Sequence, residues 1–433
     1  MAAWIGDVFT SRAGWEHLET LVDIGDRMAG TPGERRAAEE TRDALDRYAR
    51  DARLEEFEIQ GWERESATIE TDAGPEEAIA LPRSPGGTVS GELVDVGYGL
   101  PSDFENADLD GAIVMASSDV PDWYDRYIHR REKYYYAVEA GADGFIYRNH
   151  VEGCLPPTGS VGGADGPLGD IPTVGVSKEV GSRLARREEG QTVTLDVSVS
   201  TGEATSQNVH ARLGPDTERE VLVTAHVDAH DIAEGAMDNG AGTAMVVEVA
   251  KALERREEEL DTAVHFIVFG AEEVGLLGSS FDADRRNHED VKTVVNFDGV
   301  VRARTIAFHT HGFDALEAAA RNVTERYDHP IYVTPEQGPH SDHWPYVQSG
   351  VPGYHVMSHT AEEGRGWGHT FADTLDKLEH RTFTEQAILL TDLVVDLADA
   401  AFEVEHVSPE VIAEALEDEG TAEGMKVTGD WPY

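Results

Sequence analysis

Cysteine is nearly absent from this chain of 433 residues, in which Cys154 is the only one. A single thiol excludes an internal disulfide and any zinc site built from cysteines. Lysine is scarce too, with six residues among the 35 that are lysine or arginine. No apolar run approaches the roughly 18 residues that suggest a membrane span. The amino-terminal residues lack the basic start and apolar core of a signal peptide, so we expect a cytoplasmic protein.

Acidic residues outnumber basic ones, 84 to 35, which gives a formal net charge of −49. Such a charge repels nucleic-acid phosphates and anionic lipid heads, so we expect neither nucleic acid nor a membrane as a partner. The mutual repulsion of these acids destabilises a compact state unless salt screens it. The balance is similar to that of cytoplasmic proteins from salt-accumulating halophilic archaea. We therefore expect a halophilic protein, with an unusually acidic mesophilic protein as the alternative.

The pattern of predicted strands, helices and turns divides the chain into one interrupted domain and an insert. Strand-like and helical segments alternate from about residue 207 to 405, a pattern typical of a mostly parallel sheet covered by helices. Short strands between Gly/Pro turns fill the stretch before them. We predict an α/β fold with a mixed, mostly parallel central sheet flanked by helices, and a small β-rich inserted domain. The predicted ranges are 1–77 and 201–405 for the main domain, 78–200 for the insert and 406–433 for an acidic, loose C-terminal tail.

Polar side chains follow three predicted strands, near 221–227, 263–269 and 291–297, at the point where each strand ends. Because parallel strands have their carboxyl ends at one edge of a sheet, we expect these side chains to meet there. A turn after the first strand adds one more carboxylate. The side chains are, in chain order, His226, Asp228, Asp238, Glu272, Glu273 and Asp298.

Carboxylates this numerous conflict at short range unless a cation offsets their charge. Imidazole with carboxylates suits zinc, and two carboxylate-bridged divalent metals form a hydrolytic site. Each feature alone is more often structural: a hydrogen-bonded His-x-Asp pair, two glutamates at a solvated helix start, or aspartates in turns. The coincidence of three strand ends is what favours a metal site.

Five segments together resemble peptidase family M28, the group of dinuclear zinc aminopeptidases and glutamate carboxypeptidases. They are HVD at 226–228, GAMDNGAG at 235–242, FGAEEVGLLGS at 269–279, NFDG at 296–299 and GHTFADT at 368–374. The resemblance covers about 15–70 and 205–400, and it implies a zinc-peptidase (phosphorylase/hydrolase-like) fold. In the insert, VDVGYG, DGAIVMAS, AGADGFIYRN and IPTVGVS resemble the protease-associated (PA) domain that many members carry at this place.

The resemblance implies two divalent metal ions per chain, with Zn²⁺ as the expected metal. His226 and Asp298 would bind one ion, Glu273 and His369 the other, and Asp238 both.

The same resemblance gives Glu272 the role of general base. It also implies that Asp228 accepts a hydrogen bond from the far nitrogen of His226 and fixes its tautomer. The peptide bond between Asp238 and Asn239 would be cis, as in the family.

Histidines are frequent near the carboxyl end, and composition does not choose among His340, His343, His355, His359 and His369. Only His369 has the context of the family's last ligand, and we expect His343 to be structural or to support the site. His230 and Asp231 are expected to be loop residues that line the site, with exposed surface residues of an acidic protein as the alternative.

The chain departs from the family at Gly368, where aminopeptidases often carry Tyr, and at Gly299, where they often carry Met. Tyr354 is one residue that could replace the missing Tyr.

We predict a metal-dependent exopeptidase that removes N-terminal residues from short peptides, using a water activated between two zinc ions. A carboxypeptidase or dipeptidase of the same fold is the nearest alternative, and a one-zinc aminoacyl cyclase is a weaker one. A non-catalytic, receptor-like binding protein is the alternative from another class, although such relatives usually lose ligands. The insert is expected to limit substrates to short peptides. Its aromatic stretch 123–136 fits core packing, with a lid or a homodimer contact as the alternatives.

Overall fold

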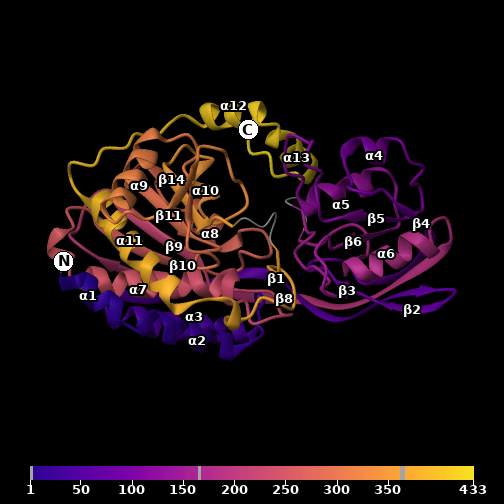
Figure 1. Cartoon of the computed structure of the whole chain (residues 1–433), viewed down its shortest axis with the longest axis horizontal. Coiled ribbons are helices and arrows are strands. Elements are labelled where there is room, and N and C mark those ends of the chain that lie inside the picture. The colour runs from indigo at the N-terminus through magenta and orange to yellow at the C-terminus, as the bar shows by residue number, and fades with distance from the viewer. Residues whose placement is uncertain (1–2, 164–166, 361–365) are drawn as a thin grey trace.

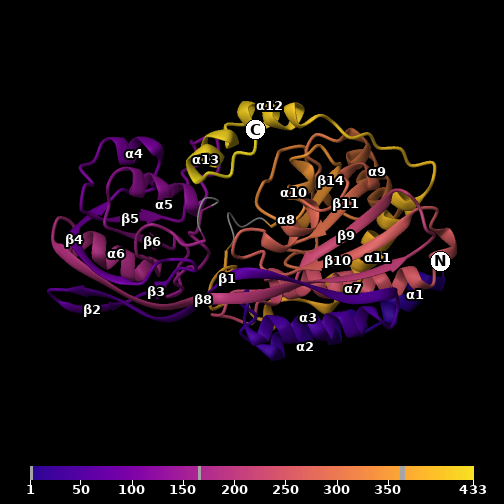
Figure 2. The same ribbon diagram turned by 180° about the vertical axis from the view of Figure 1, so that it is seen from behind.

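The computed structural model describes residues 3–163, 167–360 and 366–433, and it places two bodies of unequal size beside each other (Figures 1 and 2). The larger body is built on a sheet of strand order β13-β12-β14-β11-β9-β10-β8. Within it β9 runs parallel to β10 and β11, and β11 parallel to β14, whereas β8 and β12 pair antiparallel with their neighbours β10 and β14. These strands are β8 (Thr192–Leu213), β9 (Glu220–His226), β10 (Ala263–Phe269), β11 (Val291–Phe297), β12 (Ile306–His309), β13 (Ile331–Thr334) and β14 (Gly353–Ser358). The predicted mixed, mostly parallel sheet is confirmed.

Both faces of this sheet are covered, and the central strands β9, β10 and β11 are accordingly buried along their whole length. Val221 and Val223 of β9 join the core under one helical layer, whereas Leu222 between them packs on the opposite face with Tyr346. The first layer consists of α1 (Ala3–Thr10), α2 (Ala13–Ile24), α3 (Pro32–Leu45), α7 (Ala241–Glu254), α9 (Asp314–Arg326) and α11 (His380–Ala398). The second contains α8 (Leu277–Ala283) and α10 (Trp344–Val347). In the described part of the chain, no helix combines the length and the apolarity that crossing a membrane requires.

A long antiparallel ribbon connects the two bodies (Figure 1). It consists of β1 (Arg50–Thr71) and β8, which pair from Arg50 with Arg212 to Glu70 with Thr194. One end of β8 pairs with β10 of the larger sheet and the other with β4 of the smaller one. The ladder continues through Gly61 and Gly202, which lie opposite each other although glycine is a poor strand former on its own.

The smaller body continues the ribbon with parallel pairs between β4 and β5, β5 and β6, and β6 and β7. Its α5 (Arg130–Glu139) carries part of the aromatic stretch 123–136. Tyr134 of α5 is fully buried, as core packing requires, but Trp123 is 71% exposed. The elements are β2 (Gly74–Glu77), β3 (Ile79–Ala80), β4 (Gly87–Asp95), β5 (Ile113–Ser117), β6 (Gly144–Arg148), β7 (Thr173–Val176), α4 (Pro101–Glu105), α5 (Arg130–Glu139) and α6 (Lys178–Arg187).

The C-terminal segment crosses from the larger body to the smaller one (Figures 1 and 2). It forms α12 (Pro409–Asp418) and α13 (Thr421–Thr428), and α13 packs against α5. Arg131 of α5 binds both carboxylate oxygens of Asp430, at 2.6 and 3.2 Å. We expected a loose tail here. The difference has a physical cause, because buried Met425 and Ala422 give this acidic segment an apolar face to pack.

Candidate active site

The strand ends deliver the predicted side chains to one place, and Asp238 lies between two groups of them. Its Oδ1 is 3.5 Å from His226 Nε2, and its Oδ2 is 3.0 Å from His369 Nε2. On the first side, His226 Nε2 also lies 3.7 Å from Asp298 Oδ1 and 3.9 Å from Glu272 Oε2. We call His226, Glu272 and Asp298 the first donor group.

The second donor group consists of His369, Glu273 and His230. His369 Nε2 is 3.4 Å from Glu273 Oε2, and His230 Nε2 is 2.9 Å from the same oxygen. All the residues that the sequence suggested as ligands therefore converge, and His230 joins them. The sequence placed His230 in a loop that lines the site but not among the ligands, because a histidine two residues beyond an Asp in a loop has no recognisable ligand pattern.

Asp238 sits on an irregular π-helical turn, Ala236–Gly240, which contains a cis peptide bond between Asp238 and Asn239, as predicted. Asn239 fastens the turn by donating to Phe297 O at 2.8 Å and accepting from Gly242 N at 3.0 Å. Residue 242 must be glycine, because a Cβ there would come within 2.3 Å of Phe297 O.

Asp373, in the GHTFADT segment, supports the same turn from the other side. Its carboxylate accepts hydrogen bonds from the main-chain amides of Met237 at 2.8 Å and Asp238 at 3.1 Å. The segment that carries His369 therefore also fixes Asp238, so His369 and Asp238 keep their positions relative to each other.

The carboxylate of Asp228 has partners beyond the one expected. It accepts hydrogen bonds from the main-chain amides of Glu272 and Glu273, both at 3.1 Å. His226 Nδ1 lies 3.5 Å from the same carboxylate and 3.1 Å from the main-chain oxygen of Asp228. Asp228 thus orients the two glutamates directly, from beside His226.

Two buried residues from the N-terminal segment support the site, and sequence reasoning missed both. Arg27 is 1% exposed and donates to the carbonyl oxygens of Val227, Glu234 and Gly235, which brackets the loop between β9 and the Asp238 turn. No local pattern marks Arg27, because its acceptors lie about two hundred positions away along the chain.

Glu34 is the second of these residues, and it is fully buried in the first turn of α3. Its carboxylate accepts from Ser206 Oγ at 2.6 Å and from Ala271 N at 3.0 Å, directly before the two glutamates. Ala271 has a positive φ of 56°, a conformation that a non-glycine residue adopts only when its surroundings hold it. Glu34 is one of the contacts that hold it.

The electrostatics of the donor groups fit a bound cation. Burial raises the pKa of Glu272 well above its ordinary value, with His226 opposing this and Glu273 and Asp298 adding to it. Burial also raises the pKa of Glu273 to about 7, against the effect of His369. Among the described residues, His226 Nε2 and Glu273 Oε1 have no hydrogen-bond partner. Buried carboxylates that resist ionisation next to unpartnered donor atoms suit zinc, which imidazole and carboxylate bind well.

The other histidines lie beside the donor groups rather than in them. His343 is buried between the rings of His311 and His355, and its Nε2 lies 2.9 Å from Gly338 O. Tyr354 is fully buried and donates to Leu316 O, so it does not take the place of the Tyr that Gly368 replaces.

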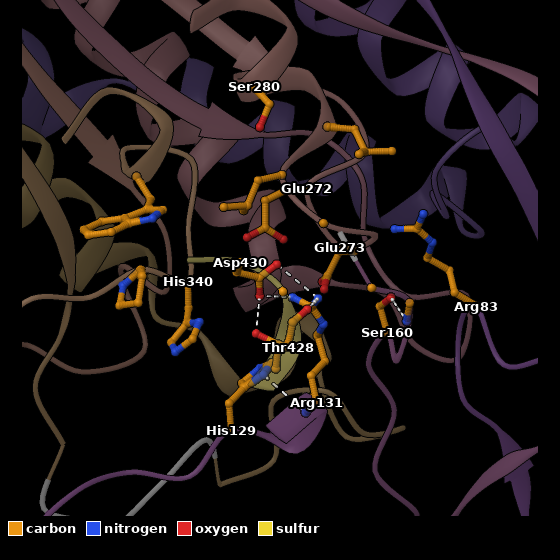
Figure 3. A pocket seen from close by; sticks show the side chains of 18 of the residues that line it. Arg83, His129, Arg131, Ser160, Glu272, Glu273, Ser280, His340, Thr428 and Asp430 are labelled. Carbon is orange, nitrogen blue, oxygen red and sulfur yellow. Dashed lines mark hydrogen bonds and ion pairs between the residues drawn. The ribbon is translucent and has the colours of Figure 1, made fainter. Parts of the chain in front are cut away.

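A cavity of about 1,090 Å³ opens from the donor groups. The larger body contributes Glu272, Glu273 and His340, the smaller body contributes Arg131, and the C-terminal segment contributes Asp430 (Figure 3). The ion pair between Arg131 and Asp430 therefore lies in the wall of the cavity, where it ties the smaller body to the C-terminal segment.

Comparisons with known proteins agree with this architecture. The sequence model of peptidase family M28 matches residues 208–394, and that of the PA domain matches residues 89–184. Aminopeptidase YwaD of Bacillus subtilis is 29% identical over 393 residues, which is 86% of this chain and 81% of that protein.

Two solved structures are similar over nearly the whole chain. The aminopeptidase from Aneurinibacillus sp. strain AM-1 has a TM-score of 0.71 at 25% identity, covering 94% of this chain and 98% of that one. BSAP, a zinc aminopeptidase from Bacillus subtilis, has a TM-score of 0.71 at 26% identity, covering 90% and 96%. The family match, the inserted PA domain and the shared fold together identify residues 208–394 as a peptidase domain of family M28.

Proposed function

We propose that this peptidase is a zinc-dependent aminopeptidase that removes N-terminal residues from short peptides. The observation that carries the proposal is the pair of donor groups with Asp238 between them. Relatives named as aminopeptidases, one of them as a zinc aminopeptidase, support the choice of reaction and metal.

Two Zn²⁺ ions would be held by the chain's own side chains, one by His226 and Asp298, the other by Glu273 and His369, with Asp238 shared. Bound zinc would lower the pKa of the attacking water and polarise the carbonyl of the substrate.

Glu272 is the general base of the proposal. It takes a proton from the attacking water and later gives it to the leaving amine. Burial raises the pKa of Glu272, which favours its holding the proton between the two transfers. Asp228 keeps the main chain of Glu272 in place through the 3.1 Å hydrogen bond from the Glu272 amide.

The charge distribution along the cavity supports cleavage at the amino end. Carboxylates dominate its inner end, whereas Arg83 and Arg130 line the wall contributed by the smaller body. Arg83 donates to the carbonyl oxygens of Pro167 and Val274, neutral acceptors that do not cancel its charge. A short peptide would place its amine beside the carboxylates and its own carboxylate toward the arginines. A carboxypeptidase would require the opposite polarity.

The test begins with protein purified in molar KCl, whose zinc content is measured. We expect two zinc ions per chain and hydrolysis of leucine p-nitroanilide that a chelator abolishes and zinc restores. A preparation without divalent metal and without chelator-sensitive hydrolysis would refute the proposal.

Dipeptides blocked at one end test whether the enzyme acts at the amino or the carboxyl end of its substrate. An aminopeptidase cleaves a dipeptide amide and leaves an N-acetyl dipeptide intact, because it requires the free amine. The reverse result would identify a carboxypeptidase.

A further inference from the structure

His230 occupies a place in the site that the resemblance to the family did not assign. It lies in the loop between β9 and the Asp238 turn, and its side chain is only 5% exposed. Its ring meets the ring of His369 edge to face, with centroids 4.5 Å apart and planes at 81°. Its Nε2 lies 2.9 Å from Glu273 Oε2. The imidazole is therefore directed into the second donor group rather than toward solvent.

The contact between His230 and Glu273 does not have the geometry of a hydrogen bond. Among the residues that the structure describes, neither ring nitrogen of His230 has a hydrogen-bond partner, although Glu273 Oε2 is so close. Buried polar groups are nearly always hydrogen-bonded unless they serve a ligand or an ion. Ligand atoms of His230, Glu273 and His369 all lie within 4.8 Å of one another, as ligand atoms around one common ion do.

A small cavity lies at this position. It measures about 10 Å³ and is lined by His230, Asp238, Glu273 and His369, among others. That is roughly the space of one water-sized sphere. The cavity thus offers room for a single ion between two imidazoles and two carboxylates.

An imidazole binds a metal ion through the lone pair that one ring nitrogen keeps in its neutral form.

We propose that His230 is a further ligand of the metal ion held by Glu273 and His369, so that this ion has two imidazole ligands and the ion at His226 has one. This inference rests on the proposed function. Its consequence is an asymmetric pair of sites, because the second ion gains a donor that the first lacks. A chelator should therefore remove the two ions in separate steps, the ion at His226 first.

The experiment uses the full-length protein in molar KCl. X-ray absorption at the zinc edge counts imidazoles on the unmodified protein, and we expect three imidazoles over two ions, an average of 1.5 per zinc. An average of one imidazole per zinc would overturn the inference, and this measurement does not depend on the folding of any variant.

Variants provide the second measurement. We expect His230→Ala to weaken binding of one of two zinc ions by about 10–100-fold or more in competition with a chromophoric chelator, leaving the other unchanged. His230→Gln can still donate a hydrogen bond to Glu273 but is a poor zinc ligand, so it should behave like His230→Ala. His340→Ala, which alters an exposed histidine of the same cavity, is the matched control and should bind zinc as the unmodified protein does.

Two results would show that His230 is not a ligand: unchanged zinc affinity in His230→Ala, or restoration of the affinity by His230→Gln. In either case the unmodified protein would still bind two zinc ions and hydrolyse leucine p-nitroanilide. Failure of this inference is therefore distinguishable from failure of the proposed function, in which the unmodified protein itself binds no metal.

Discussion

Replacing Glu272 with glutamine separates proton transfer from metal binding. The substitution keeps the size of the side chain but removes its ability to accept a proton. The main chain should not move, because the Glu272 amide is held by Asp228 at 3.1 Å and the amide of the next residue is held by the same carboxylate. The variant should therefore keep its metal.

The expected loss follows from the role of a positioned base. Such a group contributes about 10²–10⁴-fold to a rate, which corresponds to about 3–5 kcal/mol in the activation barrier. We expect kcat on leucine p-nitroanilide to fall by this factor with little change in KM. The zinc content, measured on the same preparation, should equal that of the unmodified protein.

Glu273→Gln is the matched control, because it makes the same chemical change one residue away. Glu273 lies 3.4 Å from His369 Nε2 in the second donor group, so its loss should reduce zinc content as well as turnover. The reasoning would be refuted if Glu272→Gln kept its turnover within tenfold of the unmodified protein. It would also be refuted if the two variants exchanged their expected effects.

Four further predictions concern the cavity, pH and salt. A tripeptide with a free carboxylate should have a lower KM than its amide, and Arg83→Met should remove the difference. Arg131→Met and Asp430→Asn should each raise the rate on a decapeptide relative to a tripeptide, because each breaks the tie across the cavity. Burial lowers the pKa of His17 and of His265 to about 4. Each should therefore lower the free energy of unfolding as pH falls below 6.5, by about 2 kcal/mol at pH 5. Urea unfolding at constant salt measures this loss, which should be smaller in His17→Gln. The melting temperature should rise steeply from 0.1 to 2 M KCl, and a flat profile would contradict the role assigned to the acidic surface.

The central sheet and the converging donor residues could be predicted because both follow from the strand ends. Each of β9, β10 and β11 is buried on both faces, so apolar residues predominate in its sequence and its end can be recognised. His226, Glu272 and Asp298 come within a few residues of these ends, and parallel strands bring such residues to one edge. His369 follows no such strand and was found only through resemblance.

The parts that sequence reasoning missed depend on contacts between distant segments. Arg27 and Glu34 reach main-chain groups about two hundred residues away, and nothing near them in the sequence indicates this. The C-terminal segment is acidic, and its packing on α5 depends on partners such as Arg131 that a local reading does not pair with Asp430. The two main-chain amides that bind the Asp228 carboxylate were missed for a similar reason, because they come from another loop.

The two kinds of charge repulsion in this molecule respond to different ions. Repulsion among surface acids acts over distances that molar salt screens, since the screening length falls from about 10 Å at 0.1 M to about 3 Å at 1 M. Within each donor group the ligand atoms, including those of the carboxylates Glu272 and Asp298, lie within 4.8 Å of one another and the groups are largely buried, so dissolved salt screens them little. KCl should therefore restore the folded state of a desalted protein without restoring activity to a chelated one, whereas zinc should do the converse. Salt and metal are thus separate requirements, because one acts on the surface of the fold and the other at the carboxyl edge of its sheet.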